Sequence, residues 1–104
     1  MPQPIPVATA NAQKSQYINY MTGLGVNMNS QTQSVNFPAT ALVKWLNNLG
    51  AAADEYRIFM GAYPPGTPNA GRTTVIVWPY KNGQPATDTT GALIQPYNDG
   101  AGFP

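Results

Sequence analysis

The sequence contains no cysteine and no histidine, and only 9% of its 104 residues are charged. Without these two residue types, the chain has no disulfides, no thiolate nucleophile and none of the usual nitrogen and sulfur ligands of zinc. Five Lys and Arg against four Asp and Glu give a net charge of +1. Because nucleic-acid binding needs a cluster of cations that neutralises several phosphates, we expect no nucleic-acid partner.

Long apolar runs are also absent from the sequence. No stretch approaches the ~20 apolar residues of a membrane span, so we expect no membrane-spanning segment. The N-terminal stretch MPQPIPVATA lacks the basic and apolar regions of a signal peptide as written. The low charge is compatible with a secreted or surface-assembled mature form, and the sequence leaves the compartment open.

The polar character of the chain comes from Asn, Gln, Thr and Ser, and its eleven Pro and ten Gly indicate many turns. A hydrophobic content of 42% is enough to build a core. A chain of this length predicts one domain over residues 1–104. Within it we expect a Pro-rich N-terminal arm over residues 1–8 and an irregular C-terminal tail over residues 96–104.

Periodicity and turn residues predict an α+β fold in which two helices pack on a small antiparallel β-meander of two to three strands. The dipeptide Asn82-Gly83 is a strong signal for a tight turn. The polar stretch 26–36 is expected to be a loop, with a short exposed strand as the alternative. The predicted helices cover residues 9–22 and 38–50, and the predicted strands cover 55–63, 73–80 and, for a short third strand, 92–95.

The second predicted helix has the clearest amphipathic pattern. Its apolar residues recur at i, i+3, i+4 and i+7 and form one face, which we expect to pack on the sheet. Pro38 suits the first turn, and Gly50 suits the position just past the end. The apolar face consists of Leu42, Trp45, Leu46 and Leu49.

The strand predicted over residues 73–80 is apolar on both sides. Val75 and Val77 point to one face, while Ile76, Trp78 and Tyr80 point to the other. One face is expected to pack on the second helix. The other must be covered by loops, by the terminal arms or by another molecule. Pro79 cannot donate a ladder hydrogen bond, so it is expected to mark an edge or the end of the strand.

Four stretches of the sequence follow one another in a recognisable order. They are Asn-Phe-Pro-Ala-x-x-Leu-x-x-x-Leu, Glu-Tyr-Arg-Ile-Phe-Met-Gly-Ala-Tyr, Thr-Thr-Val-Ile-Val and Lys-Asn-Gly. In this order the chain resembles a group of small uncharacterised α+β proteins from Bacteroidetes-type bacteria, over about residues 14–104. The group carries no known activity, so the resemblance implies a fold and no catalytic role.

Carboxylates and hydroxyls are the catalytic groups that this composition leaves. Asp54 and Glu55 are adjacent at the start of a predicted strand, where neighbours point to opposite faces, so a solvated turn is the favoured interpretation. Asp88 and Asp99 lie in turn-like surroundings, and the other acidic ligands of a calcium loop are missing. We therefore expect no metal, no cofactor and no enzymatic activity. A small enzyme or effector using carboxylate and Tyr groups stays an alternative.

Two arginines lie in or beside the predicted strands. Arg57 is expected to form an ion pair with Glu55, two residues away on the same face, with a ligand-binding role as the alternative. Arg72 begins the next strand and is expected to lie near Tyr63 across the hairpin, where a cation–π contact can form.

Aromatic residues gather around the Pro-rich turns, outside the predicted helices. Tyr and Trp are favoured at interfaces because they bury a large area at a small entropy cost. The leading hypothesis is a non-catalytic interaction or self-assembly module that uses an aromatic and apolar hairpin face, with a protein or a second copy as its partner. A carbohydrate-binding module with an aromatic platform for a glycan is the other alternative. The candidate binding residues are Tyr63, Arg72, Trp78, Tyr80 and Tyr97, with Trp78, Tyr80 and Tyr97 also candidates for the core.

Overall fold

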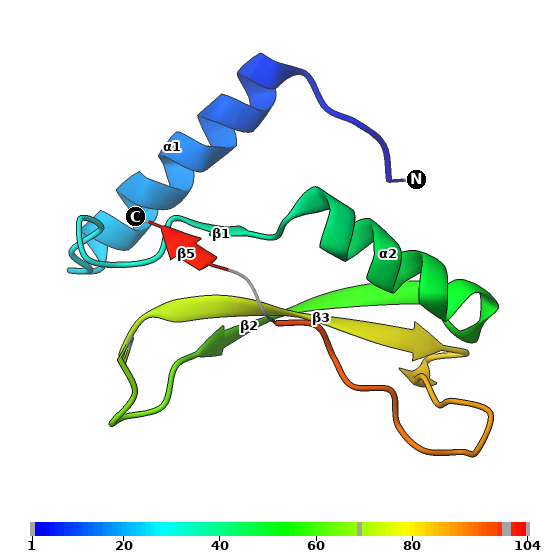
Figure 1. The fold of residues 1–104 in the computed structure, drawn as a ribbon. Helices are drawn as coiled ribbons and strands as arrows, with labels where there is room; N and C mark the ends of the chain where they lie inside the picture. The colour runs from blue at the N-terminus through cyan, green and yellow to red at the C-terminus, as the bar shows by residue number, and fades with distance from the viewer. Residues whose placement is uncertain (1, 69, 99–100, 104) are drawn as a thin grey trace.

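The computed structural model describes residues 2–68, 70–98 and 101–103, and it confirms the predicted α+β class. Two helices accompany a three-stranded antiparallel sheet with the order β2-β3-β4, and β1 and β5 form a separate antiparallel pair (Figure 1). In chain order the elements are α1 (Val7–Gly23), β1 (Ser34–Asn36), α2 (Ala39–Leu49), a 3₁₀ turn (Gly50–Ala52), β2 (Glu55–Ala62), β3 (Thr73–Lys81), β4 (Gln84–Pro85) and β5 (Ala101–Phe103).

The β2–β3 hairpin is the framework of the molecule. Eight consecutive residue pairs join its strands, from Glu55 opposite Tyr80 to Ala62 opposite Thr73. The amide of Tyr63 extends the ladder by donating to the carbonyl of Arg72 at 3.0 Å. Both strands lie where the sequence predicts them, because β-branched and aromatic residues favour a pleated surface.

The turn after β3 has the predicted geometry. Asn82 has φ 53° and Gly83 has φ 79°, the left-handed conformation that Asn and Gly accept most easily. This two-residue turn brings Gln84 directly beside Lys81, so β4 becomes the third strand. The third strand therefore lies at Gln84–Pro85, and the expected strand over residues 92–95 is reduced to a single bridge between Thr87 and Leu93.

Helix α2 begins after Pro38 and ends at Gly50, whose φ of 49° suits glycine. The apolar face of α2 is half-buried, and Trp45 on this face contacts two tyrosine rings. The Trp45 ring lies 5.9 Å from the ring of Tyr56 on β2 and 4.9 Å from the ring of Tyr97. The predicted packing of this helix on the hairpin thus includes aromatic contacts from Trp45 to both Tyr56 and Tyr97.

Helix α1 starts at Val7, within the segment expected to be an arm, and none of its residues is buried. In Figure 1 it runs on the same side of the hairpin as α2 and lies farther from the sheet. Tyr17 contributes, with Val35 of β1 and Met60 of β2, to the lining of a small cavity of about 120 Å³. Residues 2–6 are exposed, and the N-terminal segment lies on the helix side of the hairpin, so it leaves the opposite face uncovered (Figure 1).

A clamp of hydrogen bonds holds the polar loop before β1 against the start of β3. The Gln31 side-chain oxygen accepts hydrogen bonds from the amide of Thr73 at 2.8 Å and from its hydroxyl at 3.2 Å. The Gln31 side-chain nitrogen donates to the carbonyl of Gly71 at 3.2 Å. Beyond this loop, β1 pairs with β5, so residues 34–36 form the short strand that the sequence left as an alternative, and the expected irregular tail contains a strand.

Candidate interaction surface

The hydrogen-bond pattern of the hairpin decides which backbone groups face outward. The amide of Tyr63 donates to the carbonyl of Arg72, the residue opposite it, so the two form a hydrogen-bonded pair. Hydrogen-bonded and non-hydrogen-bonded pairs alternate along an antiparallel ladder. Odd-numbered residues of β2 therefore bond to β3. The amide and carbonyl groups of Tyr56, Ile58 and Met60 point to the opposite edge.

The outer edge of β3 is occupied from Val77 to Lys81. Val77 and Tyr97 exchange two backbone hydrogen bonds of 2.9 Å, and the carbonyl of Pro79 accepts from the amide of Ala86 at 2.9 Å. Pro79 is almost fully buried within β3. Its missing N–H would have faced this outer edge, so the proline leaves the β2–β3 ladder intact. The sequence expectation that Pro79 marks an exposed edge or a strand end is therefore wrong.

The outer edge of β2, in contrast, is exposed. Within the described part of the chain, β2 pairs with β3 alone. Ile58 and Met60 are 65% and 69% exposed, and Tyr56 and Phe59 are 37% and 39% exposed. A long apolar edge strand with outward-facing backbone groups is a template for pairing with another strand. This edge is the strongest candidate for an interaction surface.

The hairpin has one face toward the helices and one away from them, which we call the far face. On the far face, the ring of Phe59 meets Trp78 edge-on at 5.7 Å and lies 6.2 Å from the ring of Tyr80. Arg57 lies over the Tyr80 ring, 4.1 Å from its centroid. The far face therefore carries an aromatic cluster that continues from β3 to the exposed strand β2.

The predicted ion pair between Arg57 and Glu55 is confirmed. The Nε atom of Arg57 donates to Oε1 of Glu55 at 2.6 Å, and both side chains are about half exposed. This hydrogen bond raises the pKa of the Arg57 guanidinium above its ordinary value. The charge on β2 is thereby matched within the strand itself.

Two of the predicted binding residues, Trp78 and Tyr80, belong to the far-face cluster. Both are half-buried, and the indole nitrogen of Trp78 is shielded from solvent. The Phe59 ring is inclined by 76° to Trp78 and by 38° to Tyr80. Because these angles differ so much, the rings of Trp78 and Tyr80 cannot be coplanar. They do not form the flat platform that the carbohydrate alternative requires.

The other predicted binding residues lie elsewhere. Tyr97 packs between Phe37, 5.3 Å away, and Trp45, so it belongs to the packing under α2. Tyr63 and Arg72 pair through their backbones at the loop end of the hairpin, where two guanidinium nitrogens of Arg72 are shielded from solvent. The cation–π contact expected there forms at Arg57 and Tyr80 instead. The five predicted residues therefore do not form one patch.

The carboxylates that the structure describes have structural partners. Asp54 accepts a hydrogen bond from the amide of Asn82 at 3.2 Å, and Glu55 holds Arg57. Asp88 accepts from the hydroxyl of Thr90 at 2.6 Å and from the amides of Thr90 and Ala92. The hydroxyl bond from Thr90 is the main cause that lowers the pKa of the Asp88 carboxyl. Asp99 lies outside the described residues.

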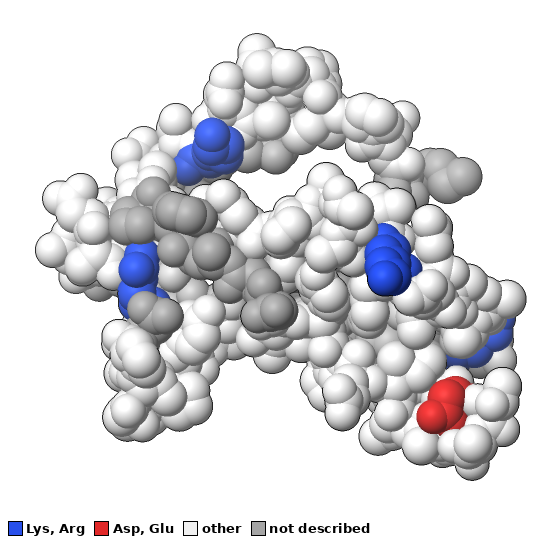
Figure 2. All heavy atoms as spheres, viewed as in Figure 1, with Lys and Arg blue, Asp and Glu red and all other residues white. Residues whose placement is uncertain are grey.

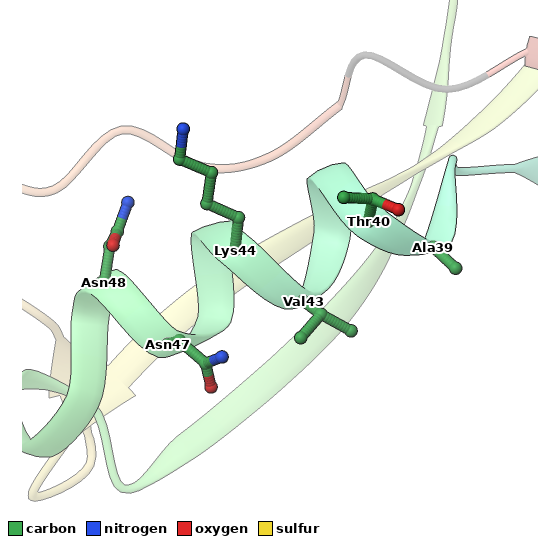
Figure 3. A pocket seen from close by; sticks show the side chains of 6 residues that line it. All are labelled: Ala39, Thr40, Val43, Lys44, Asn47 and Asn48. Atoms are coloured by element: carbon green, nitrogen blue, oxygen red, sulfur yellow. The ribbon is translucent and has the colours of Figure 1, made fainter.

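A shallow hollow of about 640 Å³ lies along the outer side of α2 (Figure 3). Figure 3 shows Lys44 and Asn48 pointing to one side of the helix and Val43 and Asn47 to another. Lys44 is the one ionisable side chain among the described lining residues, so the hollow offers no acid–base pair. The lining residues are Ala39, Thr40, Val43, Lys44, Asn47 and Asn48.

Charge does not gather into a patch on the visible side of the molecule. Figure 2 shows separate basic side chains and one acidic group on an otherwise uncharged surface. No group of three potential metal-ligating residues occurs in residues 2–68, 70–98 and 101–103. Within the same residues, no helix is both long and apolar enough to cross a membrane.

The candidate residues taken from the sequence include two of β3, Trp78 and Tyr80, and do not include Ile58 and Met60 of β2. A signal for them existed in the order of the predicted elements. The predicted strand 55–63 follows a helix and has only one predicted strand directly after it, so an edge position was the natural expectation. Its apolar side chains at Ile58 and Met60 then had no second strand beside them.

Comparison with known proteins gives no relative for this chain. No family model, no curated protein and no solved structure matches it.

Proposed function

We propose that this protein is a non-catalytic interaction module that associates through the exposed side of its β2–β3 hairpin. The observation that carries the proposal is the exposed edge of β2. There, outward-facing backbone groups accompany Ile58 and Met60, which are mostly exposed. A partner strand would satisfy these backbone groups and cover these side chains in one step.

The lack of protective features on β2 supports this proposal. Proteins commonly guard an exposed edge with Lys, Pro, a bulge or a very short strand. Strand β2 has eight residues, contains no Lys or Pro, and pairs with β3 in an unbroken register. Its single cation, Arg57, is already held by Glu55. Electrostatic resistance to a partner at this edge is therefore small.

The far-face cluster adds a second part to the proposed surface. Phe59 stands at the edge and stacks against Trp78 and Tyr80, so a partner that reaches β2 also meets an aromatic surface. Such rings bury area with little loss of side-chain entropy, because their neighbours already hold them. The non-catalytic character is supported by the structural partners of Asp54, Glu55 and Asp88.

The proposal is tested by the molar mass in solution over a concentration series. We expect the mass to rise above the 11.1 kDa of one chain as the concentration increases. Ile58→Lys should suppress this rise. Leu93→Lys, at a side chain that is 63% exposed and remote from β2 in the ladder, should leave it unchanged. A mass of one chain at every concentration, or an equal response to both substitutions, would contradict the proposal.

A further inference from the structure

We infer that the partner of β2 is the β2 strand of a second copy, paired antiparallel about a twofold axis at Ile58. This inference rests on the proposed function and adds the partner, the register and the size of the assembly. A twofold axis perpendicular to the sheet places equivalent faces of both copies on the same side. It therefore joins the two three-stranded sheets into one continuous sheet.

The hydrogen-bonding groups of β2 fit this arrangement. The outward amide and carbonyl groups belong to the even-numbered residues, as the bond between Tyr63 and Arg72 establishes. An axis at Ile58 places Ile58 opposite its own copy and Tyr56 opposite Met60. In each of these pairs both residues are even-numbered, so both carry an outward amide and an outward carbonyl. Each outward amide within the paired segment therefore meets a carbonyl of the second copy.

The side chains on the helix side of the sheet favour the same register. Tyr56 and Met60 meet across the axis on both sides of the Ile58 pair, and sulfur–aromatic contacts are favourable. The Tyr56 ring is already positioned by Trp45, 5.9 Å away. An axis at residue 59 would instead place Tyr56 opposite Ala62, which leaves the large ring without a large partner.

Charge separates this register from its other neighbour. An axis at residue 57 would place the two Arg57 side chains directly opposite each other, and like charges in that position are destabilising. The axis at Ile58 places Arg57 opposite Phe59 of the second copy. Because Glu55 already pairs with Arg57 at 2.6 Å, the strand brings a locally neutral segment to the contact.

The available surface is sufficient for a weak dimer. With the exposures given above, Tyr56, Ile58, Phe59 and Met60 together, backbone included, offer up to about 450 Å² per copy. Two copies contribute up to about 900 Å², and the exposed residues Arg57 and Ala62 of the same strand raise the sum to about the 1,000 Å² that a specific contact needs. A twofold contact uses the same patch on both copies, so the assembly closes at two copies.

The register can be tested by charge complementation at the axis. Ile58→Lys and Ile58→Glu, each alone, place like charges opposite each other and should weaken association at least about tenfold. An equimolar mixture of the two should restore association as a heterodimer. Met60→Lys and Met60→Glu form the matched control, because residue 60 faces residue 56 in this register. Because the two residues at position 60 do not face each other in this register, mixing the two Met60 variants should not restore association.

The outcomes separate the inference from the proposed function. If association occurs and each charge at residue 58 prevents it, but the residue 58 mixture does not restore it, the register is wrong and the interaction surface stands. Restored association in the Met60 mixture would place the axis at residue 60 instead. Restored association between Ile58→Lys and Met60→Glu would place the axis at residue 59. If the single substitutions leave the association of the native chain unchanged, both the surface and the inference are overturned.

Discussion

The two outer edges of the β2–β3 hairpin differ in whether other segments of the chain pair with them. Along β3, Tyr97 bonds to Val77, Ala86 bonds to Pro79, and β4 pairs with the strand end. Along β2, Ile58 and Met60 remain exposed beside outward-facing backbone groups. In the part of the chain that the structure describes, the segment after β4 returns to the β3 edge, and β2 pairs with β3 alone. The difference between the edges locates the interaction surface more sharply than the apolar content of either strand.

The covered edge also shows why a proline is tolerated inside a strand. Pro79 sits where its nitrogen faces outward, and its carbonyl still accepts a bond from Ala86. A proline at a position facing β2 would break the central ladder. The same alternation that makes Pro79 harmless on β3 leaves the groups of Ile58 outward on β2.

The largest loss of stability is expected from Trp45→Ala. This substitution removes a side chain that contacts both the exposed strand β2 and the segment that covers β3. Trp45 touches Tyr56 of β2 and Tyr97 of the segment that covers β3. We expect a loss of about 3 kcal/mol in the free energy of unfolding, the low end for truncating a large aromatic residue, because Trp45 is half-buried. Equilibrium denaturation measures this loss.

The matched control for Trp45 is Val43→Ala on the outer side of the same helix. Val43 is 51% exposed, so we expect its truncation to cost less than about 1 kcal/mol. Equal losses for the two variants would show that α2 is not held by the aromatic contacts at Trp45.

Gly83→Val should loosen the covered edge of β3. Gly83 has φ 79°, where a β-branched side chain is strained, and the turn it forms places β4 beside β3. We expect a loss of about 2 kcal/mol in the free energy of unfolding. Gly83→Asn is the control, since Asn accepts this conformation more easily and should lose less. A stability equal to that of the native chain for Gly83→Val would rule out the assigned turn geometry.

A smaller effect is expected from Gln31→Ala, which releases the loop before β1 from the start of β3. The substitution removes the acceptor of the Thr73 amide and the donor to the Gly71 carbonyl. We expect a loss of about 1 kcal/mol, since each such bond contributes little after exchange with water. Gln33→Ala provides a comparison at a neighbouring exposed amide that bonds within its own loop. A greater loss for Gln33→Ala would contradict the role of Gln31.

The smallest effect is expected at Asp88, in the turn that leads to the segment covering β3. The bonds from Thr90 lower the pKa of Asp88 in the folded state, so its charged form stabilises the fold above the ordinary pKa. That contribution disappears as the pH falls through the lower folded value. Melting temperatures of the native chain and Asp88→Asn should therefore differ at neutral pH and converge below about pH 4. A difference that grows on acidification would reverse the assignment.

Local patterns in the sequence were enough to predict the helices and the hairpin. The apolar spacing of α2 predicted its inward face, and Asn82-Gly83 predicted the turn with positive φ. The ion pair of Glu55 and Arg57 followed from their spacing on one strand face. These features depend on neighbours within a few residues, and such neighbours are visible in the sequence.

Contacts between distant segments could not be predicted in the same way. Tyr97 lies 20 positions from Val77 in the sequence, and no local pattern indicates that it covers the β3 edge or stacks on Trp45. The clamp at Gln31 joins residues more than 40 positions apart. Trp78 is half-buried against Phe59, so it is a less accessible candidate than Ile58. The sequence alone did not contain that distinction.

Hydrogen exchange of individual backbone amides tests the central claim most directly, because it reports on each edge separately. The amide of Val77 is bonded to Tyr97 and should be protected at every protein concentration. The amide of Ile58 should exchange rapidly in dilute solution and become protected as the concentration rises and β2 pairs with another copy. Protection of Ile58 that is the same in dilute and concentrated solution would contradict the account of β2 as an open, pairing edge.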